Sequence, residues 1–273
     1  MVELTAVGFV FTAGLVTAVA TGIGAIPFFL IDEVSDRVNV TMWGFASGIM
    51  VAASVFGLLF EAVSPHLPGV VPTRVLVLIG IGVSAGAALV WVSHHVIAGV
   101  DVDPGDFTEA DYRKLLVILG ILTVHSFPEG VAVGVAFADL GVSGGTPIFG
   151  VVVPVLAIFM TVAISIHNIP EGVAISIPLR SMGVSPWRMV WWSIFSSLPQ
   201  PIGAVLAFGF VQIARDLLPM GFGFAAGAMV FLVATEFIPE ARAIGADLPY
   251  RGSRSLIGGF TLGIMTMLPL LFV

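Results

Sequence analysis

The sequence predicts an all-α integral membrane protein with eight transmembrane helices, and three observations carry this prediction. Of the 273 residues, 58% are hydrophobic and only 10% are charged. The mean hydropathy of +1.11 is that of a chain that lies mostly in a bilayer. Uncharged or nearly uncharged runs long enough to cross about 30 Å of hydrocarbon recur along the whole chain.

Short polar connections separate the eight runs and leave no room for a soluble domain. We therefore expect a single transmembrane domain over 1–273, embedded in the lipid bilayer and without a nucleic-acid partner. No cysteine occurs, so disulfides and thiolate metal ligands are excluded. Glycines and prolines between 144 and 154 leave the start of the fifth span open. The predicted spans are 4–31, 38–60, 75–100, 115–138, 148–179, 189–214, 217–235 and 255–273.

The basic residues predict how the chain is oriented. With the N-terminus outside, the inner connections hold eight Lys and Arg residues and the outer connections hold two. This bias predicts a multi-pass protein of the cell membrane whose two termini are both external. The inner residues are Arg37, Arg113, Lys114, Arg180, Arg188, Arg242, Arg251 and Arg254, and the outer ones are Arg74 and Arg215.

Two stretches inside the fourth and fifth spans nearly repeat each other. They read HSFPEGVAV from His125 and HNIPEGVAI from His167. In each, a glutamate follows the histidine by four positions, at Glu129 and Glu171, and residues four apart share one face of a helix about 6 Å along its axis. Ionisable residues inside a span are functional by default. The repetition predicts two equivalent ligand pairs that converge.

A proline lies inside each stretch and affects the backbone next to the ligand pair. It removes an amide donor and frees the carbonyl four residues earlier, which is that of Val124 or Ile166. Interrupted helices at membrane depth are tolerated where they line a cavity, as at the substrate sites of transporters. We expect such an interruption in both spans. The alternative is a proline kink held by neighbouring helices, with the His and Glu side chains hydrogen-bonded structurally.

A second repetition links the second and seventh spans. GFASGIMV at 44–51 resembles GFAAGAMV at 223–230, and the same offset of 179 (223 minus 44) places Glu61 on Glu240. Because these spans cross in opposite directions, the pattern predicts inverted repeats, in which spans 1–3 match spans 6–8 around the central spans 4 and 5. Close packing of small residues is the alternative explanation.

With these motifs, the chain resembles the ZIP (Zrt/Irt-like) family of divalent metal transporters, and in particular its GufA-like prokaryotic branch. The resemblance rests on HSFPEG in span four and HNIPEG in span five, and it covers essentially the whole chain. It implies a 3+2+3 helix arrangement and uptake of divalent cations, most of all Zn²⁺, toward the cytoplasm by a protein that is not an enzyme. Cd²⁺, Fe²⁺, Mn²⁺ and Co²⁺ suit imidazole and carboxylate ligands too. A homodimer is an open expectation.

The resemblance implies that His125, Glu129, His167 and Glu171 bind the metal at mid-membrane. It also implies that Met50 in span two can add a thioether ligand, although Met50 as a flexible core filler is an equal alternative. The two glutamates sum to −2 and one dication neutralises them, so we expect protons to replace the metal when the site is empty.

Three positions depart from the family pattern where a second metal usually binds. Ser126 stands where Asn is common, Asn168 where an acidic residue often follows, and Gln200 where several relatives carry Glu. Each change weakens or removes an oxygen ligand or its charge. We therefore predict one metal and not a bridged pair, with these three residues as weak or outer contacts.

Other readings of the same residues stay open. A membrane-embedded zinc hydrolase would also use His, Glu and metal, but the HExxH arrangement is absent. A metal-selective channel would share the ligands. Glu236 and Glu240 are four apart near the inner end of span seven, and they predict either an exit site or an ordinary helix end. His94 and His95 are expected to be solvated interface residues.

Overall fold

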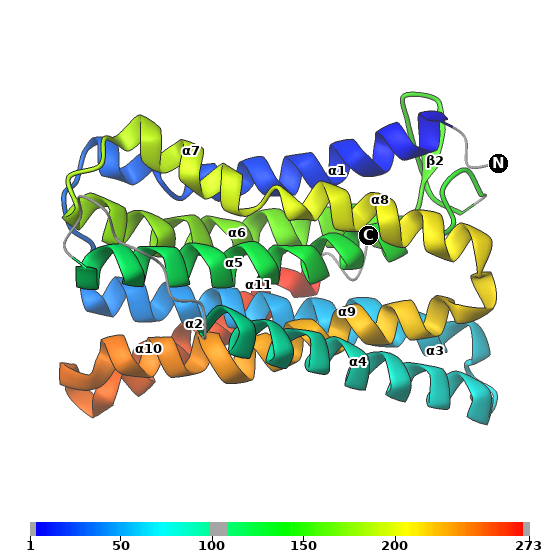
Figure 1. Cartoon of the computed structure of the whole chain (residues 1–273). Helices are drawn as coiled ribbons and strands as arrows, with labels where there is room; N and C mark the ends of the chain where they lie inside the picture. Colours follow the sequence, from blue (N-terminus) through cyan, green and yellow to red (C-terminus); the bar gives the residue numbers. More distant parts are fainter. Residues whose placement is uncertain (1–3, 99–108, 143, 270–273) are drawn as a thin grey trace.

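The computed structural model describes residues 4–98, 109–142 and 144–269, and most of them are helical (Figure 1). Six of the described segments are long and apolar enough to cross a membrane, which confirms an α-helical membrane protein. Helices also occupy the other two predicted positions, at α5 (Glu109–Ala136) and α11 (Ser253–Met267). Residues 99–100 and 270–273, which end two predicted spans, lie outside the described residues. The six segments are Leu4–Phe29, Asp36–His66, Thr73–Val96, Val155–Ser181, Pro186–Ile213 and Arg215–Asp247.

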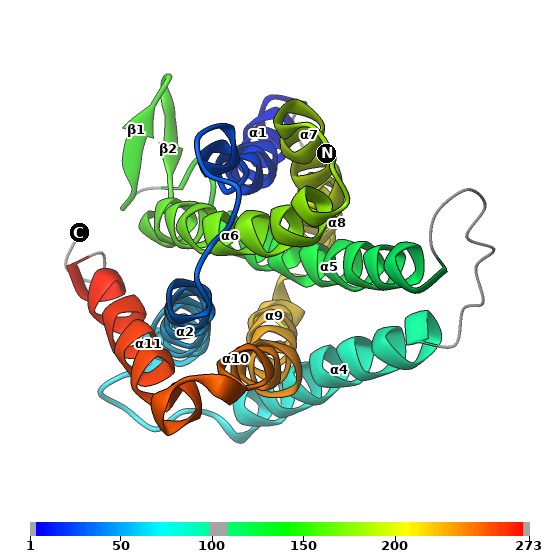
Figure 2. The same ribbon diagram turned by 90° about the vertical axis from the view of Figure 1, so that its left-hand side faces the viewer.

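The helices gather in two groups that lie against each other (Figure 2). Group one contains α1 (Leu4–Ile23), α5, α6 (Val155–Ser181), α7 (Pro186–Ser196) and α8 (Pro199–Ile213). Group two contains α2 (Asp36–Ala52), α3 (Phe60–Val63), α4 (Thr73–Ala98), α9 (Leu218–Leu232), α10 (Ile238–Ile244) and α11. Across the boundary, α2 packs on α6 and α9 packs on α5. Short 3₁₀ turns cover η1 (Ile26–Phe29), η3 (Ser64–His66), η4 (Arg215–Leu217), η6 (Gly245–Asp247) and η7 (Pro249–Gly252).

Glycines bring the helices of group two into backbone contact. A Cβ added at Gly48 on α2 would overlap the carbonyl oxygen of Phe260 on α11. A Cβ added at Gly227 on α9 would overlap the carbonyl oxygen of Val83 on α4. No side chain fits at either position unless the two backbones move apart, so these helix pairs pack in the manner of small-residue transmembrane pairs.

Two long helices contain a π-helical turn at matching positions. The turn η2 (Ala53–Leu59) joins α2 to α3, and the turn η5 (Val233–Phe237) joins α9 to α10. Adding 179 to 53 and 59 gives 232 and 238, so η5 at 233–237 lies within the positions that match η2 in the predicted repeat. Such turns are frequent at functional sites, and η5 carries Phe237, whose ring contacts a histidine of the predicted metal site.

The prolines of the two motifs do not interrupt their helices. Helix α5 continues through Pro128 and α6 continues through Pro170, so the predicted interruptions are wrong. Neighbouring helices hold both segments, and one missing amide leaves the rest of the helical hydrogen bonds intact. The break occurs instead in the predicted sixth span, where α7 ends at Ser196 and α8 begins at Pro199. Proline is suited to the first turn of a new helix.

The predicted fifth span begins later than its hydropathy indicated. Residues from position 148 to 153 belong to an antiparallel hairpin of β1 (Thr146–Ile148) and β2 (Val151–Val153), which adds a small sheet to the expected helical fold. Phe149 (φ 47°) and Gly150 (φ 81°) form its turn. Three consecutive valines favour a strand, and an apolar run this short does not distinguish strand from helix in sequence.

Candidate metal centre

Three side chains from the two central helices meet on the side of group one that faces group two. Glu129 comes from α5, and His167 and Glu171 come from α6. Each offers a ligand atom, and these atoms all lie within 4.8 Å of one another. His167 Nε2 is 3.1 Å from Glu129 Oε1. All three side chains are buried, so the group is a compact, water-poor set of one imidazole and two carboxylates.

Part of this group has no hydrogen-bond partner within the described residues. Both carboxylate oxygens of Glu171 and the Nδ1 atom of His167 are in this state. A buried polar atom left without a partner is costly, and a buried carboxylate more so. A dication placed between the three side chains would bind the free oxygens and offset both charges. The donor set therefore fits a divalent metal such as Zn²⁺.

His125, the fourth predicted ligand, lies outside the group of three. Its side chain is buried and its Nδ1 atom has no hydrogen-bond partner within the described residues. Its ligand atoms do not join the set that lies within 4.8 Å. His125 is one helical turn before Glu129 on α5, and Glu129 is directed to α6 by its contact with His167.

A chain of amides holds Glu129 from the opposite side. Gln200 Nε2 donates a hydrogen bond of 2.6 Å to Glu129 Oε2. Asn168 Nδ2 donates to Gln200 Oε1 at 3.1 Å and to the backbone carbonyl of Thr17 at 2.7 Å. Because the NH₂ group of Gln200 faces the carboxylate, Gln200 acts as a donor to a ligand and not as an oxygen ligand. The three predicted outer contacts thus include two that orient Glu129 through hydrogen bonds.

The third predicted outer contact, Ser126, and the predicted thioether ligand, Met50, are both buried. Ser126 on α5 and Met50 on α2 are both fully enclosed, and Met50 belongs to the main hydrophobic core. For Met50, burial fits both thioether ligation and core filling. Its ligand role stays a prediction.

An aromatic pair from group two covers His167. The ring of Phe237 stacks on the imidazole, with centroids 5.6 Å apart and planes 22° apart. Trp43 on α2 contacts Phe237 edge-on at 4.7 Å. The pair fixes the plane of the imidazole whose Nε2 atom faces Glu129. Sequence analysis missed Phe237, because an apolar residue among apolar residues carries no signal of this contact.

A second polar contact lies between α4 and η5. His94 Nδ1 is 2.5 Å from Glu236 Oε1, and 42% of the His94 side chain is exposed, so the solvated histidine that the sequence predicts also contacts a carboxylate. His95 Nδ1 is 2.8 Å from the carbonyl oxygen of Trp91, and its ring is 4.3 Å from the indole. Within the described residues, this pair does not extend to a third His, Asp or Glu at metal-ligand distance.

Comparisons with known proteins identify the family. The family described as "ZIP Zinc transporter" matches residues 92–270. A putative zinc transporter of Arabidopsis thaliana is 39% identical over 229 residues, which are 83% of this chain and 33% of the plant protein. This chain therefore spans only about a third of that relative.

Two bacterial relatives match over most of their length. Zinc transporter ZIPB of Bordetella bronchiseptica is 32% identical over 94% of this chain and 79% of its own. Zinc transporter GufA of Myxococcus xanthus is 28% identical over 93% of this chain and 95% of its own, as expected for the predicted GufA-like branch. With both central helices carrying the paired motifs inside the matched region, the chain belongs to the ZIP family of zinc transporters.

Proposed function

We propose that the chain carries divalent metal cations, Zn²⁺ foremost, across the cell membrane toward the cytoplasm. The observation that carries the proposal is the buried group of Glu129, His167 and Glu171, with both Glu171 oxygens unpartnered within the described residues. The relatives are named as zinc transporters, one of them as a putative one, and this supports the choice of metal. Two carboxylates and an imidazole also suit Cd²⁺, Fe²⁺, Mn²⁺ and Co²⁺.

We assign His125 to the same pathway as the fourth ligand. Its buried Nδ1 atom has no partner within the described residues, and it lies one turn from Glu129 on α5. A change of rotamer is sufficient to move an imidazole by several ångströms. Met50 would complete the coordination from group two.

The site is proposed to hold one metal ion. The oxygens of Glu171 and one oxygen of Glu129 are available to it, whereas Glu129 Oε2 is engaged by Gln200. Replacing Gln200→Glu would add a carboxylate beside Glu129 and remove its donor. Metal analysis of purified protein should then rise from one Zn²⁺ per chain toward two. Two ions bound to the unmodified protein would overturn the single-metal assignment.

The proposed architecture is eight spans in a 3+2+3 arrangement of inverted repeats. Equivalent helix contacts support it: Gly24 on the first span abuts the backbone at Ile169 and Val173, and Gly203 abuts the backbone at Phe127 and Val131. The residue numbers of the partners of Gly24 are 42 higher than those of the partners of Gly203 (169 minus 127, 173 minus 131), and 42 is the offset between the two motifs. The residue number of Gly203 is 179 higher than that of Gly24, and 179 is the offset between the second and seventh spans.

The eight-span arrangement and the distribution of basic residues lead us to propose that both termini are external. A cysteine placed near position 70, in the connection before α4, should then react with a membrane-impermeant maleimide in intact cells. A cysteine placed near position 184, before α7, should not react until the membrane is opened. A homodimer is compatible with this arrangement.

The transporter proposal is tested by metal flux into liposomes that contain the purified protein. We expect saturable Zn²⁺ uptake that is lost in Glu171→Gln and His167→Ala and retained in Glu33→Gln, which removes a carboxylate from an exposed residue outside the site. Uptake that never saturates, yet needs the same residues, would identify a channel. Tight Zn²⁺ binding without any flux would contradict transport and favour a hydrolase.

A further inference from the structure

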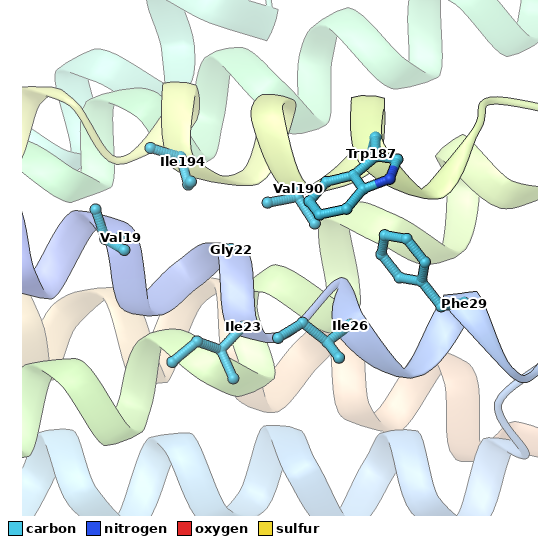
Figure 3. A pocket seen from close by; sticks show the side chains of 8 residues that line it. All are labelled: Val19, Gly22, Ile23, Ile26, Phe29, Trp187, Val190 and Ile194. Atoms are coloured by element: carbon cyan, nitrogen blue, oxygen red, sulfur yellow. The ribbon is translucent and has the colours of Figure 1, made fainter.

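An apolar groove lies on the outer side of group one, between α1 and α7 (Figure 3). Its volume is about 430 Å³, which is within the range of small-ligand pockets. One wall is formed by Val19, Ile23 and Ile26, and the other by Val190 and Ile194. The side chains of both walls are hydrocarbon, and the groove follows the direction of the helices.

The shape of the groove follows from one glycine and one aromatic pair. A Cβ at Gly22 would lie 2.7 Å from Ile194 Cγ1, so the missing side chain lets α1 and α7 approach at the floor. At the end where α7 begins, Phe29 and Trp187 meet edge-on with ring centroids 5.0 Å apart. The groove is therefore closed at its floor, bounded by two rings at one end, and open toward the surroundings of the bundle.

The surroundings of this groove are the bilayer, because both walls belong to membrane-spanning segments. An acyl chain gains no hydrophobic free energy by leaving other acyl chains, since lipid tails are as apolar as the groove. Close packing alone would hold an acyl chain in the groove. A lipid retained in the groove must therefore be selected by its head group at the polar end.

At the start of α7, where Trp187 bounds the groove, two groups that suit a phosphate are adjacent in sequence. Arg188 follows Trp187, is exposed, and has no ion-pair partner within the described residues. Trp187 is 74% exposed, and its indole N–H donates to no acceptor in the described part of the chain. Tryptophan at a membrane interface presents its N–H to the head groups. Basic residues beside grooves between transmembrane helices attract anionic head groups.

We propose that this groove binds one acyl chain of an anionic phospholipid, whose phosphate pairs with Arg188 and accepts from Trp187. The site is separate from the metal centre, and none of its lining residues is a predicted ligand. The lipid fills the open side of the groove and adds packing contacts between α1 and α7 outside the close approach of the two helices at Gly22.

The test is native mass spectrometry of the protein released from nanodiscs of phosphatidylglycerol and phosphatidylcholine in equal amounts. Ile23→Trp fills the groove from α1, and Val77→Trp adds the same ring to an exposed position on α4, outside the groove. Arg188→Gln removes the charge, and Arg37→Gln removes another exposed charge as its control. Zn²⁺ uptake of each variant verifies that it has folded.

We expect one retained phosphatidylglycerol in the unmodified protein, in Val77→Trp and in Arg37→Gln, and none in Ile23→Trp. In Arg188→Gln a lipid should remain, with its preference for phosphatidylglycerol reduced roughly fivefold, the effect of one basic residue near a membrane surface. Equal lipid retention in Ile23→Trp would overturn the proposal. So would an unchanged preference in Arg188→Gln, or a lipid-free dimer that Ile23→Trp separates, because a second copy would then occupy the groove.

Discussion

The two copies of the histidine–glutamate motif are both helical, but their glutamates have different neighbours. Glu129, in HSFPEG, accepts a hydrogen bond from Gln200 and approaches His167. Glu171, in HNIPEG, has two buried oxygens without a hydrogen-bond partner within the described residues. Other protein groups therefore orient the carboxylate of Glu129, whereas the carboxylate of Glu171 is free to bind a ligand.

The glycines of the two motifs make matching contacts with neighbouring helices. A Cβ at Gly130 would overlap the carbonyl oxygen of Gln200, and a Cβ at Gly172 would overlap that of Thr21. Gln200 and Thr21 are 179 apart in sequence, which is the offset of the proposed repeat. Only Gln200 is long enough to reach a carboxylate. The Thr21 hydroxyl lies 2.7 Å from the hydroxyl of Ser197 instead.

This comparison indicates how similar helix contacts can surround an asymmetric site. The glycine contacts of the two motifs match, whereas the residues that they meet, Gln200 and Thr21, differ in side-chain length. Residues that hydrogen-bond to a metal ligand orient it and can influence metal affinity strongly, as the ligands themselves do. The four predictions below test the comparison, from the largest expected effect to the smallest.

Replacing either glutamate should abolish transport but change stability in opposite directions. Both Glu171→Gln and Glu129→Gln should lower Zn²⁺ affinity roughly 100-fold or more, because each removes a buried carboxylate ligand. Without metal, Glu171→Gln should raise the apparent Tm by about 2–4 °C, since it replaces a buried carboxylate without a partner in the described residues by a neutral amide that costs less to bury. Glu129→Gln should lower it by a similar amount, since it disturbs the contacts with Gln200 and His167.

Thermal unfolding in detergent with a zinc chelator measures both shifts, and flux in liposomes measures transport. Equal Tm changes in the two variants would contradict the asymmetry between Glu129 and Glu171.

Removing the amide of Gln200 should weaken metal binding without removing a ligand. Gln200→Ala leaves Glu129 Oε2 without its donor, and we expect Zn²⁺ affinity to fall about 10- to 100-fold. Isothermal titration of the purified protein, with competition by a chelator, gives the value. An unchanged affinity would mean that the carboxylate keeps its orientation through His167 alone.

Adding a methyl group at either motif glycine should destabilise the protein to a similar extent. Gly130→Ala and Gly172→Ala force apart backbones in contact, at an expected cost of about 1–3 kcal/mol each. Gly209→Ala on α8 is the control, because a Cβ there meets nothing within 4 Å. Denaturation curves of the three variants give the comparison. A large difference between Gly130→Ala and Gly172→Ala would show that the two halves are not equivalent in packing.

The smallest effect is expected at the matching position of the other half. Thr21→Val keeps the shape of the side chain and removes its contact with Ser197, at an expected cost of about 1 kcal/mol. Zn²⁺ affinity should not change, because the Thr21 hydroxyl contacts Ser197 and not Glu171. The same titration that is used for Gln200→Ala decides this. A loss of affinity would place Thr21 in the metal site after all.

The sequence predicted which two helices carry the clustered side chains, because His and Glu are conspicuous in apolar spans. It also placed Gln200 near the site, although as a weak contact and not as the donor that orients Glu129. The direction of an amide depends on neighbours such as Asn168, which come from another helix. The sequence did not predict the contact of Phe237 with His167 for the same reason, since this stacking depends on how helix group one packs on helix group two.

Local backbone features were predicted less well than spans. Pro128 and Pro170 were expected to break their helices, and neither does, because the surrounding helices hold the backbone on both sides of each proline. The hairpin at 146–153 was assigned in part to a span, since its valines are as apolar as a transmembrane helix. Hydropathy reports that a segment is buried or lies in lipid, and it does not report the hydrogen bonds that the backbone makes.

The aromatic pair beside His167 gives the protein an internal optical reporter. Trp43 is 8% exposed and touches Phe237, which lies on the imidazole, so metal binding at His167 should alter its emission. The other tryptophans face outward, where brominated lipids can quench them. Emission that survives such quenching therefore comes from Trp43, and its change on titration with Zn²⁺ would follow occupancy without any added dye. The outward tryptophans are Trp91, Trp187, Trp191 and Trp192, with 44–74% of their surface exposed.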